Sequence, residues 1–345
     1  MFKKVKIFYF FCFLGIGLYF FTQSIVAETV ETSNLALDYQ QKNDLQNQVK
    51  ELFDREKYEE LESLVSRIRE NKERFIGGDW KLEYFYLGLR TAYKQLDTQN
   101  MLAKEQNFAR WRSNYPNSVT TCIAWADYLK EIAWRYRGNG YADSVSLEGW
   151  KKFQEYLERI PLLFDEAQKL SEKDAHLYAV MITVGNAIGF NKELLFEYLG
   201  KGLILNPDYF PLYVRMTTIL LPRWQGVSGE VEKFADSVLN DTQSAHGYAF
   251  YALIADKVRS YVGWNDFLKF NFPWDKIKKG FDELLIQYPA NFYYLNAYAQ
   301  FACIYKNKSV AKVLFDKIGN LWDGSSEEIW REKKILDSNR AWSLK

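Results

Sequence analysis

The sequence is poor in cysteine, histidine and proline: of its 345 residues, three are Cys, two are His and seven are Pro. So few cysteines exclude a scaffold built on disulfides, and two histidines leave little material for a zinc site. The chain also has no large excess of positive or negative charge, since it contains 45 basic and 44 acidic residues, so we expect no nucleic-acid partner. The chain instead carries 48% apolar and 17% aromatic residues, enough for a large folded core.

Residues 1–27 have the pattern of a secretory signal peptide. Three lysines within the first six residues precede an uncharged apolar run over 7–21, and Ala27 is small enough for a cleavage site. The run is short for a membrane-spanning helix, but Ile25 fits the cleavage pattern poorly, so a retained anchor stays the alternative. We expect an exported protein, periplasmic or secreted, that touches the inner membrane only if this segment is not cleaved.

Removal of these residues leaves two cysteines, Cys122 and Cys303, in apolar surroundings typical of helices. One disulfide between them would require distant segments to meet, and two buried free thiols are the other interpretation. The two cysteines lack the close spacing of metal ligands, so the sequence predicts no metal site.

A helical spacing recurs along the chain: a bulky residue, two spacers, a second bulky residue, a small residue and a later packing position. These positions share one helical face, and the small residue lets a neighbouring helix approach. Two start-to-start intervals are 35 residues, close to the period of about 34 typical of stacked helix pairs. The six segments begin at Tyr84, Cys122, Tyr178, Tyr213, Tyr248 and Leu295.

Over residues 80–320 this pattern resembles the tetratricopeptide-like superfamily. The resemblance implies an all-α fold, an α-solenoid of tetratricopeptide-like helical hairpins. Prolines at 116, 207 and 289 precede three of the six segments and predict helix boundaries there. The expected divisions are a signal peptide over 1–27, a polar linker over 28–40, and a repeat domain over 41–345 with an N-terminal helix pair over 41–72 and a C-terminal capping helix over 325–336.

Three loops interrupt the helical pattern, each after the first helix of a repeat. Stacking should therefore bring them to one rim of the solenoid, where insertions often build a binding face. Arginine beside tryptophan can stack a sugar or hold a carboxylate, but it can equally be an internal brace. The rim candidates are Arg135, Arg137, Arg223, Trp224, Gln225, Trp264 and Trp274.

Trp80-Lys81-Leu82, Arg137-Gly138 and Pro222-Arg223-Trp224-Gln225-Gly226 together resemble a bacterial family of unknown function with tetratricopeptide-like helices. That resemblance covers nearly the whole chain after the signal and implies no activity.

A second candidate surface is the groove lined by the first helices of the repeats. The positions that line it in tetratricopeptide-like folds are mostly polar here, and both histidines fall at the same one, two residues before a signature residue. A histidine at a helix start can also be an ordinary capping partner. The groove candidates are Asp127, Lys130, Glu131, His176, Thr183, Asn186, His246, Asp256, Asn296 and Gln300.

Signatures of catalysis are mostly missing: there is no Gly-rich phosphate loop and no Gly-x-Ser-x-Gly elbow. A pair of acids across an aromatic cleft would suffice for glycan cleavage, and Asp127, Glu131, Glu230 and Asp256 could supply it. We expect a non-catalytic scaffold that binds a peptide or protein partner in the cell envelope, without a cofactor. The alternative is an all-α envelope enzyme that cleaves glycans, or a carbohydrate binder; a structural subunit is a third interpretation. The sequence does not indicate the oligomeric state.

Overall fold

A computed structural model describes residues 35–94, 96–138, 140 and 142–345, and these residues form an all-α fold. In this part of the chain the one β feature is an isolated bridge between Arg74 and Trp80. The predicted signal peptide lies outside the described residues. The first half contains a helix over 35–54, α2 (Tyr58–Glu70), α3 (Lys81–Thr91), α4 (Thr98–Asn114), α5 (Val119–Arg137), η1 (Ala142–Ser144), α6 (Leu147–Leu157), α7 (Ile160–Lys169), α8 (Ala175–Ala187) and α9 (Lys192–Leu205).

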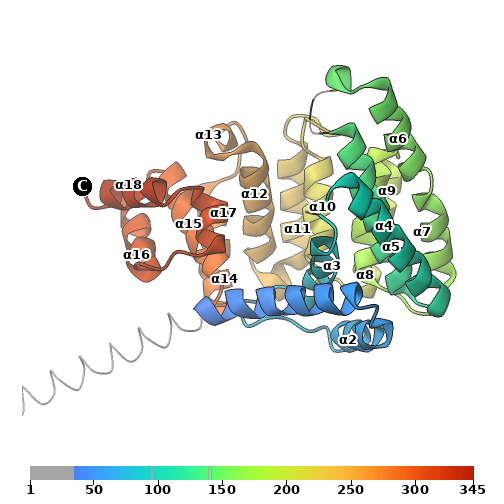
Figure 1. Ribbon diagram of the computed structural model, residues 1–345. Helices are drawn as coiled ribbons and strands as arrows, with labels where there is room; N and C mark the ends of the chain where they lie inside the picture. Colours follow the sequence, from blue (N-terminus) through green and yellow to red (C-terminus); the bar gives the residue numbers. More distant parts are fainter. Residues whose placement is uncertain (1–34, 95, 139, 141) are drawn as a thin grey trace, which may run out of the picture.

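The second half continues in the same manner and confirms the all-α prediction. Its elements are α10 (Pro211–Ile219), α11 (Glu230–His246), α12 (Ala249–Val262), α13 (Trp264–Phe267), α14 (Trp274–Gln287), α15 (Phe292–Ile304), α16 (Lys308–Ile318), α17 (Gly324–Trp330) and α18 (Lys333–Ser343). From α5 onward the helices follow one another across the molecule in chain order, from the green side to the red side of Figure 1. Helix α8 packs between α5 and α10, and α12 packs on α10.

The six repeated segments predicted from the sequence all fall on first helices of hairpins: α3, α5, α8, α10, α12 and α15. Tyr248 lies one residue before α12, as its N-cap. The small residues of the pattern allow close helix contact, as expected. A Cβ added to Gly280 of α14 would lie 2.6 Å from the Cβ of Ala252 on α12, so only glycine fits at this approach.

Several helices begin with a side-chain cap from the loop that precedes them. Ser118 accepts a hydrogen bond from the Thr121 amide at the start of α5, and Asp174 accepts one from the His176 amide at the start of α8. Asn291 caps α15 in the same way. The prolines at 116, 207 and 289 lie in the connections before α5, α10 and α15, which confirms the predicted boundaries.

The N-terminal unit, residues 35–91, crosses the first helices of the later repeats and does not simply extend the stack. Along α3 and the turn before it, residues nearer the N-terminus contact the same or a later repeat. Arg90 pairs with Asp127 of α5, and Tyr86 stacks on His176 of α8. The further contacts are Glu83 with Arg215 of α10, the Trp80 indole with the Asp208 carbonyl, and the Gly77 carbonyl with the Asn291 amide.

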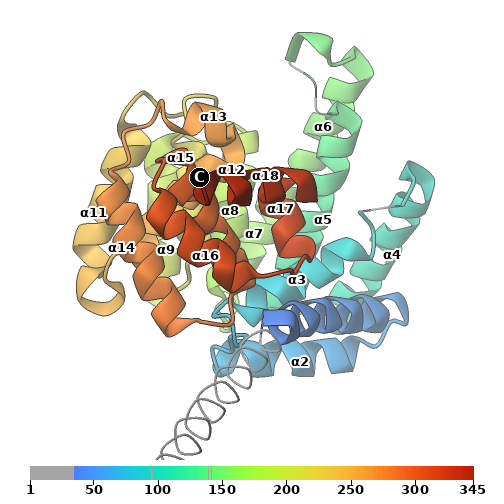
Figure 2. The same cartoon turned by 90° about the vertical axis from the view of Figure 1, so that its left-hand side faces the viewer.

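Helix 35–54 runs beside α2 along one edge of the molecule (Figures 1 and 2). Lys42 of this helix pairs with Asp38 and Asp79, which fixes the turn before α3. Tyr39 reaches the C-terminal region, where its ring lies so close to Gly324 that a Cβ at that position would be 2.9 Å away. The first described helix therefore contacts the start of the C-terminal cap.

The boundaries differ from the expected ones at both ends. The first helix is already formed at residue 35, inside the segment expected as linker over 28–40. The C-terminal cap consists of two helices, α17 and α18, because Arg331 adopts a positive φ of 66° and ends α17. Asp323 caps α17 by accepting hydrogen bonds from the Ser325 and Ser326 amides.

Candidate functional site

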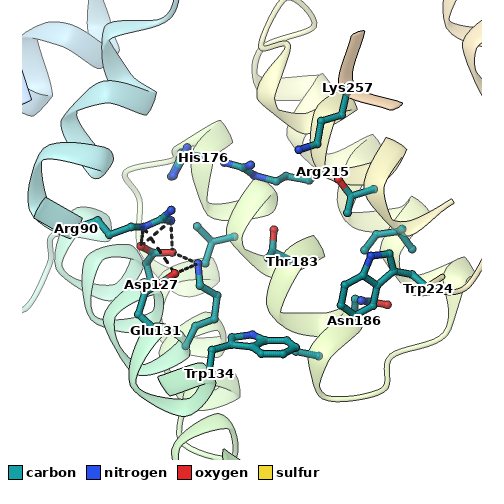
Figure 3. Close-up of a pocket in the computed structure, with 15 residues that line it drawn as sticks. Arg90, Asp127, Glu131, Trp134, His176, Thr183, Asn186, Arg215, Trp224 and Lys257 are labelled. Carbon is teal, nitrogen blue, oxygen red and sulfur yellow. Dashed lines mark hydrogen bonds and ion pairs between the residues drawn. The ribbon is translucent and has the colours of Figure 1, made fainter. Parts of the chain in front are cut away.

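A cavity of about 320 Å³ lies between α3, α5, α8, α10 and α12 (Figure 3). Its walls contain six of the ten groove candidates and one of the rim candidates, Trp224, so the helical register brought most of these side chains together. Its further polar and aromatic residues are Arg90, Trp134, Arg215, Thr218 and Lys257. The six groove candidates are Asp127, Lys130, Glu131, His176, Thr183 and Asn186.

The α5 wall is a buried ion-pair network centred on Asp127, which is 4% exposed. Arg90 of α3 binds both oxygens of this carboxylate at 3.0 Å, and Lys130 donates to it at 2.5 Å. Burial alone would raise the pKa of Asp127, but the charges of Arg90 and Lys130 outweigh burial and hold it well below its usual range. Glu131 lies 3.2 Å from the Lys130 ammonium. The Asp127 carboxylate is therefore fixed and ionised.

The α8 wall contributes His176, Thr183 and Asn186. The Nδ1 atom of His176 lies 2.7 Å from the Tyr209 hydroxyl, and burial lowers the pKa of this imidazole to about 3. His176 is therefore neutral and tied to the fold. The Asn186 side chain accepts a hydrogen bond from Gln225, and the Thr183 hydroxyl bonds back to the Ala179 carbonyl. Figure 3 shows Thr183 pointing into the centre of the cavity.

The α10 and α12 wall carries two cations, Arg215 and Lys257, which point into the cavity in Figure 3. Arg215 pairs with Glu83 of α3 at 3.0 Å. The groove register identified neither Arg215 nor Arg90, because they fall between the positions that line an open tetratricopeptide groove. No periodicity could have found Arg90, since its place depends on how α3 crosses the stack.

Two tryptophans close the cavity at the end near the loops. The rings of Trp134 and Trp224 meet edge to face, with centroids 6.5 Å apart and planes at 88°. The Trp224 indole donates a hydrogen bond to the Tyr261 hydroxyl at 2.7 Å, and 37% of the residue is exposed. The ring is thus held in place while part of its surface remains accessible.

Two further hollows continue from this cavity toward the C-terminus. The first, of about 480 Å³, shares Lys257 with it and is bounded by helix 35–54, α3, α12 and α17. The second, of about 370 Å³, shares Ser260, Tyr293 and Glu328 with the first and ends at Trp264 and Trp330. The three hollows are neighbours that share lining residues, and we call them together the trough below.

The remaining groove candidates differ in their placement. Asp256 borders the middle hollow, where Arg259 and the Tyr293 hydroxyl hold its carboxylate at 2.7 and 2.8 Å. Gln300 borders the last hollow and donates to the Ile329 carbonyl.

Two of the expected groove residues lie elsewhere. Asn296 is fully buried, and its side chain accepts a hydrogen bond from the Trp330 indole, because α17 covers this part of α15. His246 borders a small cavity of about 50 Å³ beside the middle hollow, where its Nε2 atom lies 2.8 Å from Asp208.

The three loops share one edge of the molecule, at the top of Figure 1, as the sequence predicts. Several of their residues, however, are occupied with internal contacts. Arg135 and Arg137 belong to the last turn of α5, where Arg135 donates to the Lys94 and Leu96 carbonyls. Arg137 lies between the rings of Trp134 and Trp150, about 5 Å from each centroid.

Of the other rim candidates, two make internal contacts, one is exposed and one borders the trough. Gln225 donates to Asn186 and to the Phe190 carbonyl, and Trp274 stacks on Tyr305 with centroids 5.3 Å apart. Arg223 is exposed on the loop after α10, and Trp264 borders the last hollow of the trough.

Among the described residues, no group of three or more His, Cys, Asp or Glu side chains is placed to hold a metal ion. Cys122 and Cys303 are free thiols, and burial raises their pKa to about 11 and about 12. The disulfide interpretation is therefore wrong. Within the same described part of the chain, no helix has the length and apolar character needed to span a membrane.

The fold and trough thus define an all-α protein of stacked helical hairpins. Residues 45–196 match the model of a protein family described as a domain of unknown function, DUF4034. The match runs from helix 35–54 into α9 and includes the Trp80 and Arg137 motifs, whereas the Pro222–Gly226 loop lies outside it. No curated protein and no solved structure matches the chain.

Proposed function

We propose that this protein is an exported helical-repeat scaffold of the tetratricopeptide-like kind, which binds a peptide or protein partner along its trough in the cell envelope. The observation that carries the proposal is that three neighbouring hollows over the first helices of successive repeats share lining residues. Lys257 lines both the 320 Å³ cavity and the middle hollow, and Glu328 lines both the middle and the last hollow. Extended concave surfaces of this kind are how stacked repeats bind chains.

The tetratricopeptide-like assignment is supported by the hairpin arrangement and by the two intervals of 35 residues. One difference matters for binding. Helix α3 and helix 35–54 cover one side of the trough, so a partner has to enter from the side of the loops or between α12 and α17.

The glycan-cleaving alternative has less support, because its candidate acids are engaged. Such cleavage needs one carboxyl group that stays protonated near neutral pH. Asp127 is held by Arg90 and Lys130, and Asp256 by Arg259 and Tyr293. Lys192 and the Val227 amide bind Glu230 and, despite burial, lower its pKa. Asp127 and Glu230 are therefore suited to remain charged, which favours binding over proton transfer.

The binding proposal is tested by selection from an unbiased peptide display library on the purified protein. Ser260 borders both the middle and the last hollow, and its hydroxyl donates a hydrogen bond to the Lys257 carbonyl on α12. We expect Ser260→Tyr to obstruct the trough and abolish binding of the selected peptides. Ser338→Tyr is the matched control, because Ser338 is an exposed helical serine that makes the same type of bond on α18.

Two results would count against binding in the trough. One is a library that yields no specific peptide; the other is Ser260→Tyr binding as well as Ser338→Tyr. Incubation with cell-wall polymer tests the enzyme alternative at the same time, and release of soluble fragments that depends on Asp127 or Asp256 would favour it.

The proposed export has its own test. Fusing residues 1–40 to a reporter enzyme that is active only outside the cytoplasm should give activity, and N-terminal sequencing of the intact protein should show a start near residue 28. An exported protein that still begins at Met1 would indicate the retained anchor. A reporter without activity would overturn export.

A further inference from the structure

The cavity between α3, α5, α8, α10 and α12 contains more positive than negative charge. Four cations border it, Arg90, Lys130, Arg215 and Lys257, against two carboxylates, Asp127 and Glu131. Both carboxylates are already engaged by Arg90 and Lys130 on the α5 wall, where dashed lines join them in Figure 3. The opposite wall has no carboxylate of its own inside the cavity.

On that opposite wall, Lys257 lacks a partner. Within the described residues its ammonium makes no ion pair or hydrogen bond, although the group is largely enclosed, and Arg215 is paired only with Glu83 outside the cavity. Burial and the charge of Arg215 lower the pKa of Lys257, although the charges of Asp256, Glu83 and Glu328 act in the opposite direction, so the two cations lie close enough to repel each other. An anion placed between them would relieve this repulsion.

The remaining walls fit a ring. Trp134 and Trp224 form a right-angled corner of two flat aromatic surfaces, and Thr183 and Asn186 place a hydroxyl and an amide beside it. A volume of about 320 Å³ is at the lower end of the range for small-molecule sites, which suits one or two sugar rings. Arg90 and Tyr86 of α3, which contact Asp127 and His176, close one side of the cavity.

We propose that this cavity binds an acidic sugar, with the carboxylate between Arg215 and Lys257 and the ring against Trp224. The site lies at the α5 end of the trough and does not depend on the peptide proposal, whose test concerns the hollows around Ser260.

The experiment compares three pairs of sugars on the full chain by calorimetry and ligand-observed NMR. Each pair contrasts an acidic sugar with a neutral one of similar ring: glucuronate with glucose, galacturonate with galactose, and N-acetylmuramate with N-acetylglucosamine. In at least one pair the acidic member should bind about tenfold or more tightly, as charge-assisted hydrogen bonds predict. Lys257→Met should remove this preference, whereas Lys233→Met should keep it, because Lys233 is an exposed lysine of α11 outside the cavity.

Trp224→Leu provides a second readout, since it should weaken the acidic and the neutral member of a pair alike. If Lys257→Met does not fold, the salt dependence of the unmodified protein decides: added sodium chloride should weaken only the acidic sugars. Equal binding within every pair, no saturable binding of any sugar, or a preference that survives in folded Lys257→Met would overturn the proposal. A peptide selected from the library that competes at this cavity while no sugar binds would assign the site to a peptide instead.

Discussion

The imidazole of His176 lies flat against the phenol ring of Tyr86, with centroids 4.3 Å apart and planes 4° from parallel. Tyr86 belongs to α3 and His176 to the first turn of α8, so this contact joins the N-terminal unit to a repeat ninety residues later. The Tyr86 hydroxyl also donates to Asp174, the N-cap of α8, at 2.9 Å. One aromatic residue thereby supports both the cap and the first turn of a helix that lines the cavity.

The buried imidazole should make stability depend on pH. Burial lowers the pKa of His176 to about 3 in the folded state, whereas an unfolded histidine titrates near 6.5. Between these values the unfolded chain binds the extra proton, so stability falls as pH decreases below about 6.5. From there to about pH 5 the loss is about 2 kcal/mol from this residue.

Denaturant unfolding at both pH values measures this effect. His176→Gln should reduce the pH-dependent loss by that amount, while His246→Gln should leave the contribution of His176 in place. An unchanged loss in His176→Gln would show that the imidazole is not buried as described.

Arg69 of α2 should be a strong contributor to stability. Its guanidinium binds Asp174 at 2.9 Å and also contacts Glu172 and Thr120, and the Asp174 side chain is fully buried. Arg69→Met leaves that carboxylate buried without its cation, which costs about 3–5 kcal/mol in comparable cases. Arg55→Met removes an exposed pair with Glu51 and should change the free energy of unfolding little. Equal effects of the two substitutions would contradict the burial of the Arg69 pair.

Two glycines should respond in opposite directions to the same substitution. A Cβ at Gly280 would meet Ala252 on the neighbouring helix at 2.6 Å, so Gly280→Ala should destabilise by about 1–3 kcal/mol. A Cβ at Gly200 of α9 meets nothing within 4 Å, so Gly200→Ala should stabilise by about 0.5–1 kcal/mol through helix propensity. Thermal unfolding of both variants gives the comparison, and a stabilising Gly280→Ala would disprove the tight α12 and α14 contact.

The two cysteines, one buried and one half-buried, should be unreactive in the native protein. With their pKa raised to about 11 and about 12, Cys122 and Cys303 carry almost no thiolate near neutral pH. Alkylation followed by mass spectrometric mapping should find both unmodified in the native state and both modified in denaturant. Fast native labelling of Cys122, which is fully buried, would indicate local opening of α5.

The sequence predicted the local structure well because helical periodicity is a local property. Tyr178, Tyr213 and Leu295 are buried on the first helices of their hairpins, and the Pro207 and Pro289 junctions lie between helices as expected. The candidate site was predicted where one register could reach it, as for Asp127 and Thr183.

Prediction from the same helical register failed where a segment from another part of the chain packs against the predicted position. Asn296 occupies a groove position, but α17 folds over it and buries its amide under Trp330. Arg90 enters the cavity only because α3 crosses α5 and α8, and contacts such as Trp80 with Asp208 join residues that no local pattern connects.

The crossing of the N-terminal unit also changes how the protein is expected to come apart. Ordinary repeat arrays fray, since each unit touches only its neighbours and the ends can melt independently. Here residues 77–90 reach four later hairpins, and Tyr39 meets the far end at Gly324. These contacts tie the N-terminal unit to the whole array of hairpins. Cutting the connection between α2 and α3 should therefore loosen all the hairpins together, and an intact chain should unfold in a single cooperative transition.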